Sequence, residues 1–265
     1  MNGKIYIYFK YWYVFIIIVV SEEPDFVKKN IFIGTTLRLF LSYSHKDKRI
    51  AGAIKEAFNH YGMEAFLAHE DIQVGQEWRN TILNNLKQFD VFIAVISKKF
   101  TDSNWTDQEV GFAICQEKII VPISIDGQMP YGFLEMIQTI TKFECREYNK
   151  NRYSSEIILD CKESVFEIIR IFASKTELKE KLKYSLIRSL SNIFSYASAE
   201  KHFEILNSLQ PFSKEQINEI INQSIENDQI YPAMRCRPIL MELIERYKSV
   251  IDSEKEAELS ELISS

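Results

Sequence analysis

The chain has 265 residues, of which 46% are hydrophobic and 26% charged, and its formal net charge is −5 at pH 7. This length and apolar content suffice for one domain of ordinary size and a smaller one, which excludes a disordered protein. The acidic balance, without a basic stripe interleaved with aromatic residues, argues against nucleic acid as a partner.

Residues 1–35 include an apolar stretch that is unusual for a cytoplasmic protein. Tyr11 to Val20 are ten consecutive apolar residues, fewer than the roughly 18 of a membrane-spanning helix. No small-residue cleavage site follows them, which argues against a secretory signal. Three interpretations stay open: a short membrane anchor through residues 11–20, an apolar arm docked on the fold, and an extension outside the functional fold. An anchor would leave the rest of the chain on the cytoplasmic side.

The glycines divide the remainder of the chain in two. All eight lie at or before Gly132, and glycine supplies the positive φ angles that tight strand-to-helix turns require. This boundary predicts a turn-rich α/β domain at residues 36–174, followed by a smaller all-α domain at residues 175–265.

Between residues 37 and 173, strand-like and helix-like periodicities alternate, as they do in repeated βα units. Strands are predicted at residues 37–43, 63–68, 90–97, 119–125 and 142–147. Helices are predicted at residues 50–61, 78–89, 103–117 and 132–140, and from Ser155 onward. Gly62 is a predicted helix stop, and Pro122 removes a hydrogen-bond donor from the fourth strand. The nearly continuous apolar third strand is typical of a parallel sheet covered on both faces.

Beyond Lys175 the predicted domain is helical throughout. Ser213 to Gln216 and Ser253 to Glu256 have the form of capping boxes, and each begins a predicted helix. Prolines occur at helix boundaries: Pro211, Pro232 and Pro238. We expect a bundle of four or five helices without a catalytic constellation, serving interaction or oligomerisation.

Four cysteines lie far apart in the chain. They are Cys115, Cys145, Cys161 and Cys236, with no C-x-x-C pair and no neighbouring histidine pair. This spacing supports neither a zinc site nor a disulfide framework. We therefore expect reduced, buried thiols in a cytoplasmic protein. Separately, we expect neither a bound metal nor a cofactor.

Polar residues follow three of the predicted strands. Ser44 and His45 follow the first, His69 to Asp71 the second, and Ser97 the third. In an open parallel sheet, ligands bind outside the carboxyl ends of the strands, where the strand order reverses. No G-x-G-x-x-G or G-x-x-x-x-G-K-[ST] sequence is present, so neither a Rossmann fingerprint nor a P-loop is available for a pyrophosphate.

Trp105 and Glu109 are one turn apart on the helix predicted after the third strand. At positions i and i+4 they would share a helix face, so an aromatic ring and a carboxylate could together hold the sugar of a nucleotide. The same pattern also describes a core tryptophan followed by a solvated glutamate. The place of this helix beside the crevice favours a site, with Glu109 as the stronger candidate.

Several motifs, taken in order, resemble the TIR (Toll/interleukin-1 receptor) domain family. Phe40 to Ser44 resemble its first strand, and Asp71 to Trp78 resemble the loop after its second strand. The strand at residues 90–97, the stretch Trp105 to Glu109, and Val121 to Ile123 follow in the family's order and spacing. The resemblance covers roughly half of the chain and is strongest to prokaryotic TIR domains. It implies a flavodoxin-like fold with a five-stranded parallel sheet.

The resemblance implies roles for individual residues. In enzymatic members of the family, the glutamate of W-x-x-x-E cleaves NAD at its nicotinamide–ribose bond, and here that glutamate is Glu109. A carboxylate can hydrogen-bond the ribose hydroxyls and stabilise the positive charge on the anomeric carbon as neutral nicotinamide leaves. The implied substrate-binding residues are Trp105, Phe66, Ser44, His45 and Ser97. For Trp105 and Phe66, core packing is the alternative, and His45 departs from the basic residue often found at its position.

The resemblance also implies self-assembly, because the loop after the second strand can complete the site of a neighbouring TIR domain. In this chain that loop contains Asp71, Gly75 and Trp78. The C-terminal helices are the natural candidate for controlling this assembly.

Three hypotheses about function follow. The leading one is a NAD glycohydrolase that releases nicotinamide together with ADP-ribose or a cyclic ADP-ribose, a signal for a partner effector in bacterial anti-phage defence. The second is a non-enzymatic adaptor that acts by TIR–TIR assembly and needs no carboxylate at the crevice. The third is another N-glycoside-handling enzyme, such as a nucleoside deoxyribosyltransferase, whose expected set of strand-end acids is missing from this sequence.

Overall fold

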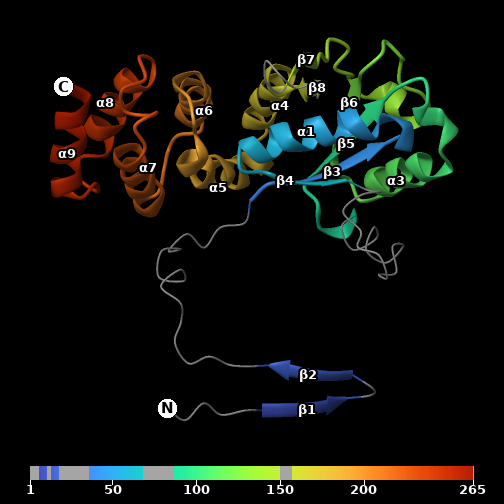
Figure 1. Ribbon diagram of the computed structural model, residues 1–265, viewed down its shortest axis with the longest axis horizontal. Coiled ribbons are helices and arrows are strands. Elements are labelled where there is room, and N and C mark those ends of the chain that lie inside the picture. Colours follow the sequence, from blue (N-terminus) through green and yellow to red (C-terminus); the bar gives the residue numbers. More distant parts are fainter. Residues whose placement is uncertain (1–5, 11–12, 18–35, 68–85, 150–156, 265) are drawn as a thin grey trace. The chain divides into compact units, whose positions relative to one another are not determined.

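The computed structural model describes residues 6–10, 13–17, 36–67, 86–149 and 157–264 (Figure 1). The chain forms two compact units, Met1–Ile33 and Gly34–Ser265. In the first unit, β1 (Tyr6–Lys10) and β2 (Tyr13–Ile17) pair as an antiparallel hairpin. Among the described residues, none of the helices combines the length and apolar character needed to cross a membrane. Of the predicted anchor at residues 11–20, residues 13–17 are described, as β2.

The second unit is built on a four-stranded parallel sheet. Its strands are β3 (Arg38–Tyr43), β4 (Glu64–Leu67), β5 (Val91–Ile96) and β6 (Ile119–Ser124), in the order β4-β3-β5-β6. Every residue of β5 is buried, as expected for a strand with both faces covered. Four predicted strands are thus confirmed, and with them the α/β class.

The strand order fixes where the helices lie. The chain crosses from β3 to β4 through α1 (Lys48–His60) and from β5 to β6 through α3 (Asn104–Cys115). Because β4 and β6 lie on opposite sides of the β3–β5 pair, right-handed crossovers place α1 and α3 on opposite faces. The strand order therefore reverses between β3 and β5, and the crevice lies at their carboxyl ends.

Strand alternation decides which side chains face α3. Phe40, Phe92 and Ala94 form one hydrophobic cluster with Val110 and Ala113 of α3. Successive side chains of a strand point to opposite faces, so Ser42 shares the α3 face with Phe40. The helical residues 86–88 supply Leu86 to the same cluster.

The predicted fifth strand at residues 142–147 is wrong. After the short 3-10 helix η3 (Gly132–Met136), only an isolated bridge joins Ile123 to Ile140. The carbonyl of Pro122 accepts the N–H of Ile140, so the ring nitrogen of Pro122 faces the same edge. A proline nitrogen carries no hydrogen, so the ladder cannot continue past this bridge toward the start of β6.

The chain after this bridge forms a hairpin instead. β7 (Arg146–Asn149) pairs antiparallel with β8 (Ile157–Asp160), and the helix predicted from Ser155 begins later, as α4 (Lys162–Ser174). The sequence at residues 142–147 has strand character, but in the parallel register of the Ile123–Ile140 bridge it lies beyond Ser124, where β6 ends.

A disulfide between Cys145 and Cys161 closes the base of this hairpin. Arg146 pairs with Asp160 in the hairpin register. This pairing brings together Cys145, which precedes Arg146, and Cys161, which follows Asp160. Cys115 is exposed and Cys236 is buried, both as free thiols. The expectation of reduced thiols is therefore wrong for Cys145 and Cys161, because spacing along the chain does not reveal the hairpin register. The expectation of burial is wrong for Cys115.

The remainder of the second unit is helical, as predicted. Its elements after α4 are η4 (Thr176–Leu178), α5 (Lys179–Ser189), η5 (Leu190–Asn192), α6 (Tyr196–Ser208), α7 (Lys214–Glu226), α8 (Cys236–Tyr247) and α9 (Ser253–Ser264). The capping box of Ser213 and Gln216 at the start of α7 is confirmed. At α9 the helix begins where expected, but Asp252 accepts the N–H of Glu254.

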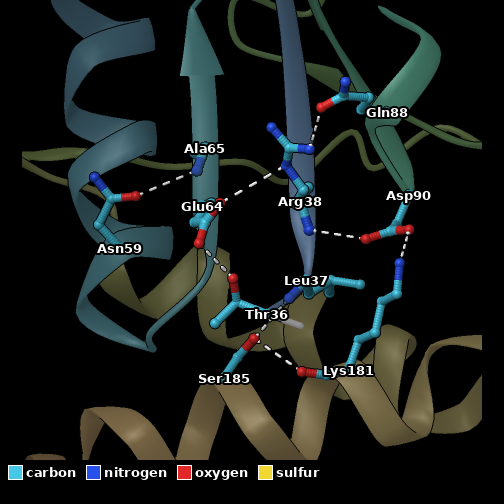
Figure 2. A network of polar contacts seen from close by, with 10 residues as sticks. All are labelled: Thr36, Leu37, Arg38, Asn59, Glu64, Ala65, Gln88, Asp90, Lys181 and Ser185. Atoms are coloured by element: carbon cyan, nitrogen blue, oxygen red, sulfur yellow. Dashed lines mark hydrogen bonds and ion pairs between the residues drawn. The ribbon is translucent and has the colours of Figure 1, made fainter. Parts of the chain in front are cut away.

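The C-terminal helices pack against the amino ends of the strands. The N–H of Leu37 donates to Ser185 Oγ at 2.8 Å, and Lys181 Nζ lies 2.6 Å from Asp90 Oδ1 (Figure 2). The other oxygen of Asp90 accepts the N–H of Arg38. The helix α1 ends at His60, and Gly62, the predicted helix stop, follows two residues later with a φ of +74°. A Cβ at Gly62 would overlap the carbonyl oxygen of Ser185. The sheet and the helices therefore belong to one compact unit.

Candidate functional site

Glu109 is buried against the centre of the sheet. It lies in the second turn of α3, its residue is 1% exposed, and Oε2 accepts a hydrogen bond from Ser42 Oγ at 2.6 Å. Oε1 has no hydrogen-bond partner among the described residues. A buried carboxyl oxygen without a partner is energetically costly, and such groups are concentrated at functional sites.

Burial also changes the ionisation of this side chain. Desolvation raises the pKa of Glu109 from 4.5 to about 7, while the hydrogen bond from Ser42 opposes that rise. Desolvation disfavours the charged form of a carboxyl group, and a donated hydrogen bond favours it. Glu109 can therefore be either a neutral acid or a carboxylate near neutral pH.

Trp105 and Glu109 both lie in α3, so the predicted helical spacing holds. Glu109 is turned toward Ser42 in β3, whereas Trp105 is half-buried. Between them, Thr106 is fully buried, and its hydroxyl is 2.9 Å from the carbonyl oxygen of Phe100 and 2.7 Å from that of Ser103. These contacts fix the first turn of α3 on the loop after β5, and so fix where Glu109 meets the sheet.

Two other predicted residues, Ser44 and Ser97, lie where β3 and β5 end, and both are buried. Ser97 Oγ donates to Asp47 Oδ2 at 2.5 Å, and the N–H of Asp47 donates to the carbonyl of Ser44 at 2.7 Å. Asp47 thus joins the loops that follow the two central strands. The crevice rim is held together by this short chain of hydrogen bonds.

His45 is exposed on the short 3-10 helix η1 (His45–Asp47) directly after Ser44. It lies at the predicted rim, on a different side of the polypeptide from the buried Ser44. Its imidazole is therefore available to solvent or to a ligand at the carboxyl end of the sheet.

Phe66 lies in β4, in register with Phe40 of β3, and the two ring centroids are 5.5 Å apart. Phe40 precedes Ser42 by two residues on the same face, so Phe66 lies nearer the amino ends of the strands than Glu109 does. Phe66 lines a cavity that Glu109 does not border. The remaining predicted residues, Asp71, Gly75 and Trp78, lie outside the described residues, as does His69.

Two residues at this edge were not predicted as site residues, namely Ser42 and Asp47. Ser42 carried a usable signal, since it is a polar residue within an otherwise apolar strand, on the alternation shared with Phe40. Asp47 carried none, because its role depends on the approach of Ser97 from a loop fifty residues away.

The site has the chemistry of a lone acid and hydroxyls. Within the described part of the chain, no group of three or more His, Cys, Asp or Glu side chains is arranged to hold a metal ion. The polar groups at the centre are one carboxyl group and the serine hydroxyl that donates to it. Such a pair can accept hydrogen bonds from sugar hydroxyls and stabilise a nearby positive charge.

Comparison with known proteins identifies the region that carries this site. Residues 39–157 match the family model of the TIR domain. A curated relative, the 2′ cyclic ADP-D-ribose synthase BtTIR of Bacteroides thetaiotaomicron, is 29% identical over 89 residues. That match covers 32% of this chain and 31% of the relative, so the similarity spans about a third of the relative's length.

A solved structure is also similar to part of the chain. It is the crystal structure of the TIR domain of the Toll-related receptor TRR-2 from Hydra magnipapillata, with 18% sequence identity and a TM-score of 0.35. The similarity covers 38% of this chain and 81% of that structure.

Proposed function

Given that residues 39–157 of this chain belong to the TIR-domain family, we propose that the protein is a NAD glycohydrolase with Glu109 as its catalytic residue. The observation that carries the proposal is the buried carboxyl group of Glu109, held by Ser42 with one oxygen unpaired among the described residues. It lies on the helix that follows β5, at the point where the strand order reverses.

The reaction has one bond to break. When the bond between the anomeric carbon of the ribose and the nicotinamide nitrogen is cleaved, the electron pair stays with that nitrogen and nicotinamide leaves uncharged. Positive charge then develops on the anomeric carbon and the ring oxygen, and a carboxylate beside them lowers the energy of this state. Nicotinamide needs no proton to leave, so a single carboxyl group is sufficient.

Two nucleophiles can complete the reaction. Attack by water gives ADP-ribose and releases one proton. Attack by a hydroxyl of the same ADP-ribosyl group closes a ring and also releases one proton. The relative's name as a 2′ cyclic ADP-D-ribose synthase supports a cyclic product, and such a nucleotide would suit the signalling role in anti-phage defence that we propose for this chain.

Catalysis requires that Glu109 become accessible to the sugar. At 1% exposure, its carboxyl group cannot touch a substrate unless neighbouring side chains separate. The unpaired Oε1 would then be able to accept a hydrogen bond from a ribose hydroxyl, which compensates for the cost of its burial. A cationic nicotinamide ring nearby would also favour the ionised form of Glu109.

Nicotinamide release from NAD by the purified full chain tests the proposal. We expect Glu109→Gln, which keeps the shape but cannot ionise, to reduce the rate at least about a hundredfold. Glu117→Gln, an equally conservative change at an exposed position just after α3, should retain wild-type activity. Mass spectrometry of the second product then distinguishes ADP-ribose from its cyclic forms.

Equal activity of wild type and Glu109→Gln would show that Glu109 is not catalytic. If both proteins are inactive even at high concentration, a non-enzymatic adaptor becomes the better account. One observation favours that second candidate: large apolar side chains are exposed around η3, with Met129 at 62%, Phe133 at 61% and Met136 at 82%. Exposed apolar clusters of this kind mark protein contact surfaces.

A further inference from the structure

A cavity lies at the opposite end of the sheet from the rim at Ser44 and Ser97. It has a volume of about 550 Å³ and opens at the amino ends of β3 and β4. The sheet contributes Arg38, Glu64 and Phe66 to its walls, and the C-terminal helices contribute Arg188, Ser189 and Asn192. Its size is that of pockets that bind small organic molecules, and neither Glu109 nor Ser42 borders it.

The walls of this cavity are held in place by polar contacts. Arg38 donates to Gln88 Oε1 at 2.6 Å and lies 3.7 Å from Glu64, whose other oxygen accepts a hydrogen bond from Thr36 (Figure 2). On the side of the helices, Ser185 is fixed to Leu37. Both walls are therefore formed before any ligand arrives, which lowers the entropic cost of binding.

Arg188 differs from Arg38 in having no polar partner within the described part of the chain. It is exposed in the last turn of α5, and no ion pair or hydrogen bond to its guanidinium is formed by any residue that the structure describes. Across the charged side chains lining the cavity, two guanidinium groups face one carboxylate, Glu64. The cavity therefore has a net positive charge and one guanidinium ready for an anion.

The cavity is also lined by the aromatic side chains of Phe40, Phe66 and Phe89. Phe66 is partly exposed and packs on Phe40, with Phe89 completing the cluster behind it. A flat ring can stack on such a surface, while a guanidinium binds a phosphate group through two parallel N–H donors. Glu64 and Asn192 add acceptors and donors for polar substituents of the ring.

We infer that this cavity binds a nucleoside monophosphate, with the phosphate on Arg188 and the base against Phe66. Since the site uses residues of both the sheet and the C-terminal helices, the bound nucleotide joins the two parts of the unit. A ligand that binds the folded protein alone stabilises it in proportion to its concentration. The inference stands on the cavity and does not require that the protein cleave NAD.

Calorimetric titration of the full chain with AMP tests this assignment. We expect saturable binding to the wild type and at least about tenfold weaker binding to Arg188→Glu, since a charge-assisted hydrogen bond becomes a repulsion. Lys214→Glu reverses an exposed charge at the start of α7 outside the cavity and should bind AMP as the wild type does. Glu109→Gln should also bind AMP unchanged, whether or not it has lost activity.

Adenosine and inorganic phosphate, titrated separately, test the two halves of the ligand. Each should bind at least about tenfold more weakly than AMP. The absence of AMP binding to the wild type, or unchanged affinity in Arg188→Glu, would overturn the inference. If Glu109→Gln loses AMP binding and Arg188→Glu retains it, AMP binds at the other end of the sheet and the inference is wrong. If inorganic phosphate binds as tightly as AMP, the ligand is not a nucleotide.

Discussion

Glu109 couples its protonation to the stability of the fold. Its pKa is about 7 in the folded chain and 4.5 as the reference value, and desolvation is the main cause. A raised folded-state pKa contributes stability that is complete below pH 4.5 and is lost as the pH rises through 7. The ionised form of Glu109, which the proposed chemistry needs, therefore lowers the free energy of unfolding at neutral pH.

This cost predicts a pH-dependent effect of Glu109→Gln, whose amide cannot ionise. Relative to wild type, the variant's free energy of unfolding should increase by on the order of 2 kcal/mol between pH 5 and pH 8. Urea denaturation of both proteins at the two pH values measures it. A difference between variant and wild type that does not change with pH would show that Glu109 does not titrate in this range.

Ser42 sets how far the pKa of Glu109 rises. Its hydroxyl favours the ionised carboxyl group, so Ser42→Ala should raise the pKa of Glu109 further. If the carboxylate is the active form, the acidic limb of the pH profile for nicotinamide release should move to higher pH by about one pH unit.

Ser124→Ala is the matched control for this shift. Ser124 is a buried serine at the end of β6 whose hydroxyl has no hydrogen-bond partner among the described residues. Its removal should leave the pH profile in place. If Ser42→Ala reduces the rate equally at every pH, its hydroxyl contributes to binding or folding but does not tune Glu109.

The helical position of Glu109 could be predicted from the sequence, whereas its pairing with Ser42 could not, although Ser42 is a polar residue in an apolar strand. The spacing of Trp105 and Glu109 is local, and one helix presents both residues. The partnership of Glu109 with Ser42 joins residues 67 positions apart and depends on how α3 packs on β3. For the same reason, no sequence pattern pointed to the contact between Asp47 and Ser97.

Among the elements, the turn between α1 and β4 is the most tightly constrained. Gly62 has φ of +74°, and a Cβ at that position would overlap the carbonyl oxygen of Ser185 in α5. Gly127 has a similar φ of +82°, but a Cβ there would meet nothing within 4 Å. The two glycines separate the cost of backbone strain from the cost of a steric clash.

Gly127→Ala should lower the free energy of unfolding by about 1 kcal/mol, from the positive φ alone. Gly62→Ala should lower it by about 2 to 4 kcal/mol, since α5 must also move away. Thermal and urea denaturation of both variants measure the difference. Equal losses would mean that α5 shifts freely and is not firmly packed against the turn.

Elements defined by local periodicity were predictable, and those defined by register were not. The four strands of the sheet and the helices α1, α3 and α5 to α9 follow patterns contained within each segment. The hairpin of β7 and β8 and its disulfide depend on which residues of the two strands face each other. That pairing cannot be predicted from the pattern of either strand alone. The missing fifth strand depends on the edge offered by β6.

At the scale of the whole molecule, the sequence predicted two parts but not where they meet. The helices α5 to α9 could be expected from capping signals and the absence of glycine. Their packing on the amino ends of β3 and β5 rests on single contacts such as Leu37 with Ser185 and Lys181 with Asp90. These contacts form the cavity that contains Arg188. It is far from the carboxyl ends of the strands, where the sequence motifs predicted a site.

At this scale we also predict that activity depends on association between copies of the protein. If a neighbouring TIR domain completes the site, the rate of nicotinamide release should rise more steeply than in proportion to protein concentration. Initial rates over a hundredfold range, together with sedimentation at the same concentrations, measure this. Inactive Glu109→Gln protein added to dilute wild type should raise the rate, because it offers every contact surface except the carboxylate. A strictly proportional rate, unaffected by the added variant, would contradict assembly.

The proline in β6 also has a consequence for the behaviour of this protein at high concentration. An exposed sheet edge with free N–H groups can recruit a strand from another chain and begin aggregation. On the outer edge of β6, Pro122 offers a carbonyl without an accompanying N–H, and Ile140 already occupies that carbonyl. The residue that stops the sheet from growing within the molecule therefore also protects it from growing between molecules, so that crowding of TIR domains need not end in fibrils.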